Sequence, residues 1–269
     1  MCDYKELYPV GGLLQQDKDD RDYKLTDLIP MRAIKLPQNY VTEKIDQGFD
    51  QGRSSECCAC AYSSIRYLQE KDKEQSEITE RFSPSFTYSN RIEGENFEGM
   101  YLRSCCKKGR DGSVPYSEFE GFYSYNKAKE LFNERKDELL EKANPFRISS
   151  FYTCATDEEI KLAIYTTKAV LIGINVVDSF YYPDEKGYIN FKENENSNGG
   201  HALAIDSWFY DENGIGYWRV LNSWGKSWGD DWYCYIKMTD LRKYFMDDAY
   251  AIVDEITEMK FKDYKEKYN

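Results

Sequence analysis

The hydrophobic pattern of this 269-residue chain changes near residue 150, and that change restricts the possible folds more than any other feature. Before this point apolar residues recur at helical spacing. After it come short runs of branched and aromatic residues, separated by turn residues. The first half predicts helices that begin at Cys57 and that cover about 100–108 and about 126–143.

The second half predicts mostly strands. An acid-capped helix is expected from Asp157. It is followed by strands at about 169–177, 201–209, 216–222, 231–237 and 248–254. We therefore expect an α+β fold in which a helical lobe over about 37–150 adjoins a β lobe over about 150–254.

The two ends of the chain differ from the middle. Residues 1–35 are polar and charged, so they predict an arm that lies over the folded body and could cover a cleft. The globular pattern begins at Leu36 and predicts one domain over 36–255. Residues 256–269 are expected to form a charged, solvated tail.

Charge and hydropathy exclude several partners and locations. The net charge of −12 opposes binding to nucleic acid and to anionic membranes. Residues 1–6 lack the basic and apolar regions of a signal peptide. The longest apolar run, Ala169–Val177, is too short to span a bilayer. The expectation is a monomeric, soluble, cytoplasmic protein, with release by a non-classical route left open.

The cysteines are expected to be free thiols. There are eight, and an even number permits disulfides. Without a secretion signal, however, and with two adjacent pairs at 57–58 and 105–106, reduced thiols fit better.

Four residue types suggest thiol chemistry. The single histidine, His201, stands in a predicted strand, and Cys57 stands where a helix N-terminus would favour its thiolate. Asn222 could accept the second imidazole N–H and so orient His201. Gln51 could donate to a developing oxyanion together with the Cys57 backbone N–H, and Trp224 could shield the His–Asn hydrogen bond from water.

Two other chemistries are open for the same cysteines. Cys57 and Cys60 form a C-x-x-C motif at a helix start, as in thiol–disulfide oxidoreductases. No suitable strand leads directly into this motif, and it leaves the segment Asn222–Gly225 unexplained. Metal binding by Cys57, Cys58, Cys60 and His201 is a weaker alternative, because paired zinc knuckles are absent.

These motifs resemble those of the papain-like cysteine peptidases, in particular the propeptide-poor branch found in microbes and large viruses. The resemblance rests on the Gly199–Ile205 strand, on Asn-Ser-Trp-Gly at 222–225 and on Asp-Gln-Gly at 50–52 before Cys57. It implies a two-lobed fold, with a helical left lobe, an antiparallel β-barrel-like right lobe and an active-site cleft between them. It also implies peptide-bond hydrolysis through a thioester, with no cofactor and with a peptide or protein as substrate.

The same resemblance assigns the site. It makes Cys57 the nucleophile, His201 the base, Asn222 the orienter and Gln51 the oxyanion donor, in preference to Gln47. It places Gly99 and Gly200 beside the substrate backbone. Acyl transfer to an amine is open as a variant of the reaction, and so is the choice between endopeptidase and exopeptidase action.

Departures from the family pattern lie next to the nucleophile. Ser55-Glu56 replaces the usual Gly-Ser pair, and Cys58 stands where an aromatic residue is common. Ser54 replaces a disulfide cysteine. We expect the Glu56 carboxylate to raise the pKa of Cys57 and to favour basic residues before the scissile bond. A catalytically weak pseudo-enzyme that binds a peptide or protein partner is therefore the alternative function.

Overall fold

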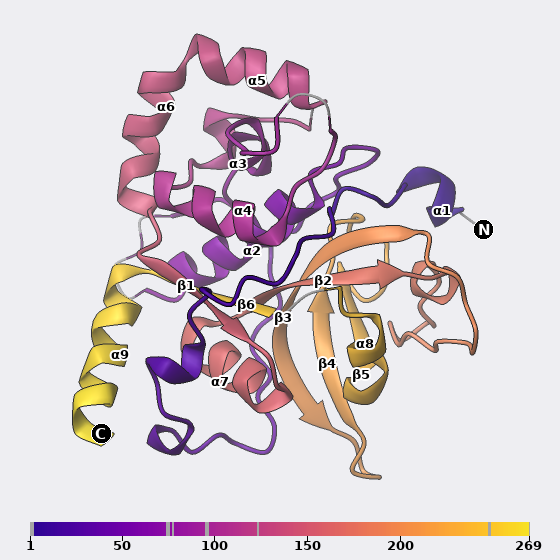
Figure 1. The fold of residues 1–269 in the computed structure, drawn as a ribbon. Coiled ribbons are helices and arrows are strands. Elements are labelled where there is room, and N and C mark those ends of the chain that lie inside the picture. The colour runs from indigo at the N-terminus through magenta and orange to yellow at the C-terminus, as the bar shows by residue number, and fades with distance from the viewer. Residues whose placement is uncertain are drawn as a thin grey trace.

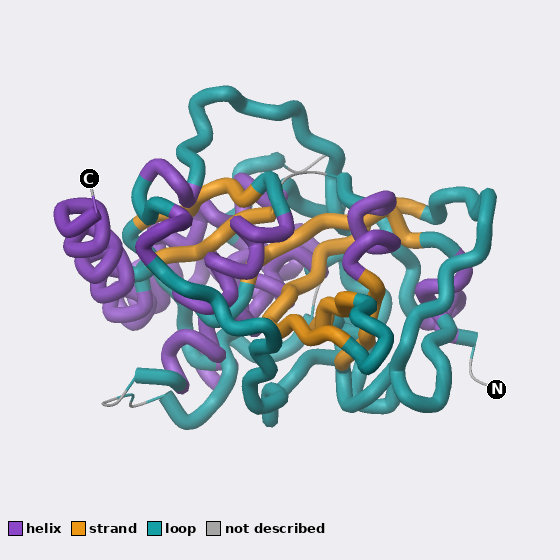
Figure 2. The backbone as a smooth tube through the Cα atoms, turned by 90° about the horizontal axis from the view of Figure 1, so that it is seen from below, coloured by secondary structure: helices purple, strands orange, loops and turns teal. Residues whose placement is uncertain are grey.

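The computed structural model describes residues 3–73, 76, 78–94, 97–122, 124–246 and 249–268. A helical lobe lies against a β-sheet lobe, and the N-terminal segment crosses the front of the molecule between them (Figure 1). α1 and the C-terminal helix lie at opposite sides of the molecule (Figures 1 and 2). The expected α+β class with two lobes is confirmed.

The helical lobe is built around one buried helix. Its helices are α2 (Cys57–Lys71), α3 (Pro84–Ser89), α4 (Leu102–Lys108), α5 (Tyr125–Glu134) and α6 (Lys136–Ala143). α2 is buried over most of its length and packs on the sheet and on α3 and α4. Small residues at its start (Cys, Ala and Ser) allow this close approach, and it begins at Cys57 as predicted.

The predicted helix over 126–143 is two helices rather than one. The break is at Arg135, which has φ −127° and ψ 21°. The two helices place Phe132 and Leu139 in one small core with Phe86 of α3. Tertiary packing against α3 thus overrides a continuous helical pattern.

The β lobe contains one six-stranded antiparallel sheet in the order β1-β6-β2-β3-β4-β5. It is an open sheet with β1 and β5 at its edges, so the expected barrel-like lobe does not close into a barrel among the described residues. The strands are β1 (Ser150–Cys154), β2 (Val170–Val176), β3 (Gly199–Tyr210), β4 (Gly216–Leu221), β5 (Tyr233–Lys237) and β6 (Ala249–Val253). The last expected strand, 248–254, corresponds to β6, which ends at Val253; residue 248 lies outside the described residues.

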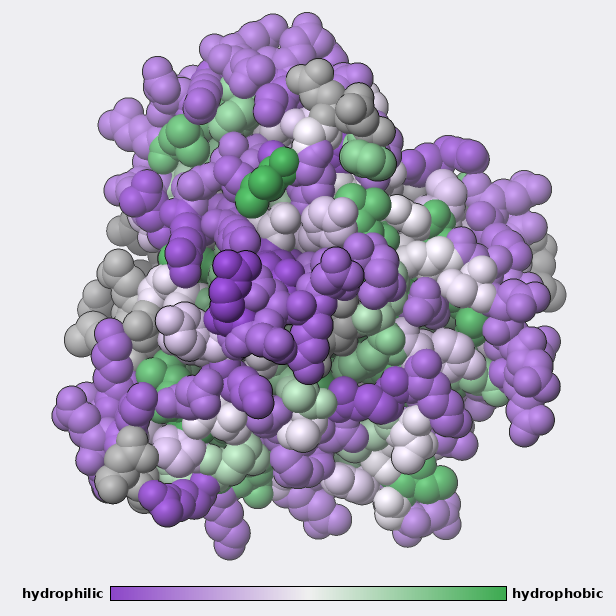
Figure 3. All heavy atoms as spheres, viewed as in Figure 1, coloured by the Kyte–Doolittle hydropathy of each residue, from purple (hydrophilic) through white to green (hydrophobic). Residues whose placement is uncertain are grey.

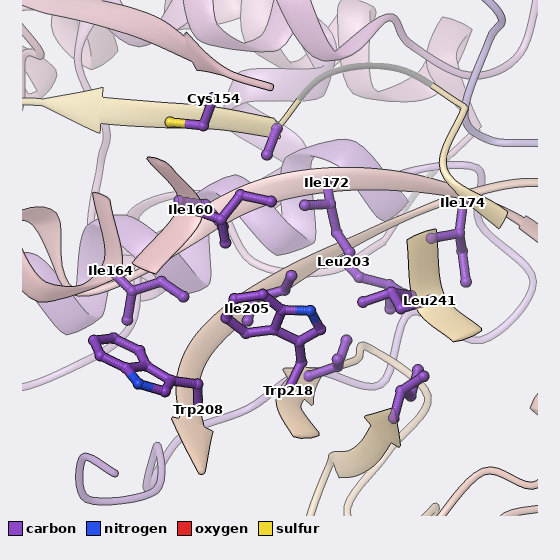
Figure 4. Close-up of a cluster of buried hydrophobic side chains, with 14 of the residues drawn as sticks. Cys154, Ile160, Ile164, Ile172, Ile174, Leu203, Ile205, Trp208, Trp218 and Leu241 are labelled. Carbon is purple, nitrogen blue, oxygen red and sulfur yellow. The ribbon is translucent and has the colours of Figure 1, made fainter. Parts of the chain in front are cut away.

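Both faces of the central strands are buried, which explains their nearly continuous apolar sequences. On one face, Ile172 and Leu203 belong to a core that α7 (Asp157–Thr167) and α8 (Met238–Tyr244) cover (Figure 4). On the other face, Leu171 and Ala204 pack in the core that contains α2. α7 begins with the expected acidic turn and a capping box between Thr156 and Glu159.

The two ends of the chain are more ordered than a solvated arm and tail would be. Leu25 and Ile29 are fully buried in the sheet core, so the segment that holds them is part of the folded body. α1 is Tyr4–Leu7, and the charged tail forms α9 (Glu255–Tyr268), which buries Phe261. The expectation of a wholly solvated tail is therefore wrong at this residue.

The hydrophilic surface and the free cysteines are those expected from the sequence. The face seen in Figure 3 is mostly hydrophilic, with small separate apolar patches. The seven cysteines in the described part of the chain are buried free thiols, as expected; Cys2 lies outside it. No helix among the described residues is both long and apolar enough to cross a membrane.

Candidate active site

Cys57 occupies the first position of the 15-residue helix α2, where unpaired backbone N–H groups favour an anion. Its side chain is almost wholly buried. Burial opposes ionisation of the thiol. The Cys58 thiol, the His201 imidazole and the Ala202 backbone N–H outweigh it, and together they hold the pKa of Cys57 well below the ordinary thiol value. These groups thus favour the thiolate form of Cys57.

The pKa of Cys57 is lowered even though the Glu56 carboxylate is its neighbour in the chain, so the net rise that Glu56 was expected to cause is not found. The Glu56 side chain is fully buried, and its two carboxylate oxygens lie 2.9 and 2.7 Å from Ser85 Oγ at the start of α3. Cys60 lies about one helical turn after Cys57 in α2. Its pKa is raised, mainly by burial and then by the negative charge of Glu56.

His201 and Asn222 form a buried hydrogen-bonded pair. His201 lies near the start of β3, and Asn222 follows the end of β4. Nε2 of His201 is 2.8 Å from Oδ1 of Asn222. The same Oδ1 accepts the Ser223 backbone N–H at 2.8 Å, so it is an acceptor and Nε2 must donate. Nδ1 is therefore the ring nitrogen left for the Cys57 thiol.

Trp224 covers this pair. Its ring centroid lies 4.9 Å from that of His201, and its side chain is almost completely buried. Tyr8, from the N-terminal segment, stacks on the indole with a centroid distance of 5.5 Å and an interplanar angle of 12°. Trp224 therefore packs beside His201, and Tyr8 packs on Trp224.

Gln51 is fixed by the loop that carries Asn222. Its backbone N–H donates to Ser223 O at 2.9 Å, and its side-chain oxygen accepts from the Ser223 hydroxyl. Nε2 then donates to Ser54 O at 2.8 Å, which directs the amide nitrogen toward the start of α2. The Gln47 amide, by contrast, donates to Thr79 O at 3.0 Å and accepts from the backbone of Arg81.

The N-terminal segment lies directly over Cys57. A Cβ on Gly12 would lie 3.0 Å from Cys57 Sγ and 2.7 Å from Ser55 O, so only glycine fits. The Met100 backbone N–H donates to Gly12 O at 2.8 Å, and the Gly11 N–H donates to Gly200 O at 2.9 Å. The segment is thus held from both lobes.

The two glycines expected beside a substrate lie on opposite sides of this segment. Gly200 contributes its carbonyl oxygen. Gly99 has φ +99°, and a Cβ there would come within 2.6 Å of Gly12 O. On the Gly99 side, the backbone groups that bind the segment belong to Met100, whose carbonyl also accepts the Leu14 N–H at 3.1 Å. Gly99 permits the close approach, and Met100 makes the hydrogen bonds.

Leu13 fills an apolar pocket beside the nucleophile. Its side chain is 97% buried and belongs to the same cluster as Met100 and Leu102. A Cβ at Gly173 would lie 2.4 Å from Leu13 Cδ2, so the missing side chain in the middle of β2 makes room for the leucine.

Sequence reasoning missed Met100, Ser223, Tyr8 and Leu13. Met100 acts through its backbone groups and Tyr8 through ring stacking, and neither leaves a specific residue signature. Ser223 binds Gln51 through its hydroxyl and its carbonyl oxygen, a role that the sequence did not indicate. Only Gly11-Gly12-Leu13-Leu14, an apolar interruption in a charged arm, carried a signal that could have been noticed.

The family model described as "Papain family cysteine protease" matches residues 95–252, which is more than half of the chain. The matched span contains His201 and Asn222. It begins after Cys57 and therefore does not include that residue. Cathepsin L of Sarcophaga peregrina is 33% identical over 82 residues, which cover 30% of this chain and 24% of the relative.

A viral cathepsin of Adoxophyes honmai nucleopolyhedrovirus is also 33% identical, over 86 residues that cover 32% of this chain and 24% of the relative. The chain thus spans about a quarter of the length of these curated relatives.

Solved structures are similar over most of the chain. Xylellain, a cysteine protease from Xylella fastidiosa, has a TM-score of 0.77 at 23% identity, with 92% of this chain and 97% of that chain covered. ProCathepsin B S9 from Trypanosoma congolense has a TM-score of 0.70 at 18% identity, with 92% and 87% covered. The fold is therefore papain-like, and the chain belongs to the papain family of cysteine proteases.

Proposed function

We propose that this protein is a cysteine peptidase that cleaves peptide bonds through Cys57, His201 and Asn222. The main support is the buried hydrogen bond from His201 Nε2 to Asn222 Oδ1. It leaves Nδ1 of His201 for the thiol of Cys57 at the N-terminus of α2. The downward shift in the pKa of Cys57 supports the same assignment.

In this mechanism the Cys57 thiolate attacks the scissile carbonyl carbon and forms a tetrahedral oxyanion. The Cys57 backbone N–H and the second N–H of Gln51 Nε2 stabilise that oxygen. His201 then protonates the leaving amine, and a thioester forms. Water, deprotonated by His201, attacks the thioester and releases the acid and the free thiolate. An amine in place of that water would give transpeptidation.

We also propose that the N-terminal segment inhibits this site while it lies over Cys57. The leaving amine must meet His201, so the part of a substrate after the scissile bond lies toward Trp224, and the part before it lies toward Met100. The arm puts Tyr8 on Trp224 and Leu13 beside Met100, which is the reverse order. Gly12 O is also bound by Met100, away from Gln51. A reversed peptide can cover the thiol without being cleaved.

The same pocket suggests one substrate preference. Because Leu13 fits beside Gly173, an aliphatic side chain of a substrate could occupy this pocket once the arm leaves. Glu56 is buried against Ser85, so a preference for basic residues finds no support from that carboxylate.

The test compares Gly12→Leu, which displaces the arm, with the Gly12→Leu/Cys57→Ala double variant on a fluorogenic peptide library in reducing buffer. Turnover by the first and none by the second supports the peptidase. No turnover by either folded variant, with Cys57 still alkylated by iodoacetamide in the first, would favour the peptide-binding pseudo-enzyme instead. Mass analysis of the products separates hydrolysis from ligation.

A further inference from the structure

The backbone edge at Gly99 and Met100 is held from behind by two buried side chains. Met100 faces the cleft and makes both hydrogen bonds to the arm. Gly99 has its N–H and its carbonyl oxygen directed away from the arm, to Tyr88 and to Arg91. The position of the Gly99–Met100 backbone therefore depends on Tyr88, which lies in α3, and on Arg91, which lies just after α3.

Tyr88 uses its whole hydrogen-bonding capacity here. Its hydroxyl accepts the Gly99 N–H at 3.0 Å and an Arg91 N–H at 3.2 Å, and it donates to Glu98 Oε2 at 2.7 Å. A phenol has one hydrogen and two lone pairs, so every position is filled. The side chain is fully buried, which leaves the hydroxyl no water as a substitute partner.

Arg91 binds several backbone groups of the loop that follows it. Its guanidinium donates to three carbonyl oxygens, those of Gly94, Phe97 and Gly99. It lies over two aromatic rings, 4.8 Å from the centroid of Tyr88 and 3.7 Å from that of Tyr125, and it is 96% buried. The two terminal nitrogens of the planar guanidinium make these bonds, an arrangement that a lysine ammonium cannot reproduce.

No disulfide holds this loop within the described residues, since all seven described cysteines are free. The hydrogen bonds that Tyr88 accepts from Gly99 and that Arg91 donates to Gly99 therefore supply the rigidity that a peptide-binding edge needs. This edge is where a bound peptide would find an N–H and a carbonyl at Met100, the groups that now bind Gly12 and Leu14.

We propose that Tyr88 and Arg91 are positioning residues that set the peptide-binding edge at Gly99 and Met100 for substrates as well as for the arm. This inference rests on the proposed function. Neither side chain touches the reacting atoms, so their loss weakens peptide binding and spares the chemistry at Cys57.

The test uses a peptidyl epoxide and iodoacetamide on the Gly12→Leu variant and on its Tyr88→Phe derivative. Loss of one buried hydrogen-bond partner is expected to raise the inhibition constant KI of the epoxide about fivefold. The maximal inactivation rate and the iodoacetamide rate should stay within about twofold. Arg91→Lys should raise KI at least as much, since lysine cannot bridge the three carbonyls.

Tyr125→Phe is the matched control, because it removes a hydroxyl from the neighbouring ring and leaves the Gly99 contacts in place; KI should not change. Thermal unfolding verifies that each variant is folded. If Tyr88→Phe does not fold, Glu98→Ala is the second variant. Glu98 is exposed and accepts the hydrogen bond from the Tyr88 hydroxyl, so its loss should also raise KI.

An unchanged KI in the folded variants would overturn the inference. So would equal losses in the maximal inactivation rate and the iodoacetamide rate, because those indicate damage to the thiol site itself. Absence of epoxide labelling in the Gly12→Leu parent is a different result: it removes the proposed peptidase function, and this inference with it.

Discussion

Gly12 of the N-terminal segment lies against the thiol of Cys57, so closely that a Cβ on Gly12 would come within 3.0 Å of Sγ. The contact brings together the charged N-terminal arm and the start of α2, which are far apart in the sequence. It makes access to the thiol depend on whether the arm stays in place.

Gly12→Leu should expose Cys57. The new side chain must displace either the arm or the Ser55 carbonyl, and overpacking of this kind costs about 1–3 kcal/mol. We expect iodoacetamide to alkylate Cys57 at least about fivefold faster, as followed by mass spectrometry of the Cys57 peptide. Lys18→Leu, a similar change at an exposed arm residue, is the control and should leave the rate unchanged.

Leu13→Ala should release the arm by a different route. The leucine is almost fully buried, and its truncation costs about 2 kcal/mol or more, or about 30-fold in the docking equilibrium. In the inactive Cys57→Ala background, trypsin should therefore cut the arm at Lys18 or Arg21 correspondingly faster. Leu7→Ala, at an exposed leucine of α1, should have little effect. Equal protection of the arm in wild type and Leu13→Ala would contradict the docking role of this side chain.

The pH dependence of alkylation should reveal the lowered pKa of Cys57. The thiolate is present above the lowered pKa and is lost only as the pH falls through it. In the Gly12→Leu variant, the iodoacetamide rate should therefore stay level well below pH 8.5, where an ordinary thiol begins to lose reactivity.

Cys58 should contribute to that shift. Its thiol favours the Cys57 thiolate, so Cys58→Ala should move the acid limb of the profile to higher pH, while Cys58→Ser keeps a donor and should move it less. His201→Ala should move it further upward. An acid limb near pH 8.5 before any of these changes would show that the thiol is not activated.

Asp206→Ala should destabilise the whole fold. Asp206 is fully buried and accepts from Arg219 Nε at 2.8 Å, and Arg219 also donates to Thr42 O. Loss of one partner from a buried ion pair typically costs about 3–5 kcal/mol, because the other charge is left without compensation. Urea unfolding measures this change. Lys71→Ala breaks a half-exposed pair with Asp46 and should have only a small effect.

The sequence predicted the elements whose signals are local. α2 begins at Cys57 because small and apolar residues follow it at helical spacing, and α7 begins where a threonine precedes three acidic residues. β2 was recognisable from its uninterrupted apolar run. Local signals failed where packing decides the outcome, as at Arg135, where one expected helix is two.

For the candidate site, too, the sequence identified local features and tertiary packing decided the rest. The residue types Cys57, His201 and Asn222 were identified from the sequence, and their catalytic roles stay predictions. The structure adds how they meet: residues 49–51 pair with residues 223–225, so that Gln51 N–H binds Ser223 O and Gly225 N–H binds Phe49 O. This contact between distant segments brings the loop after β4 to the start of α2.

By itself, the sequence determined the family, the two-lobed α+β class and the residue types of the site, because periodicity and short motifs are properties of neighbouring residues. Only the tertiary structure decided that Glu56 faces Ser85, that Met100 forms the binding edge and that Gly12 covers Cys57. Each of these depends on where segments far apart in the chain come to lie, and close packing selects one arrangement from many that the same local pattern allows.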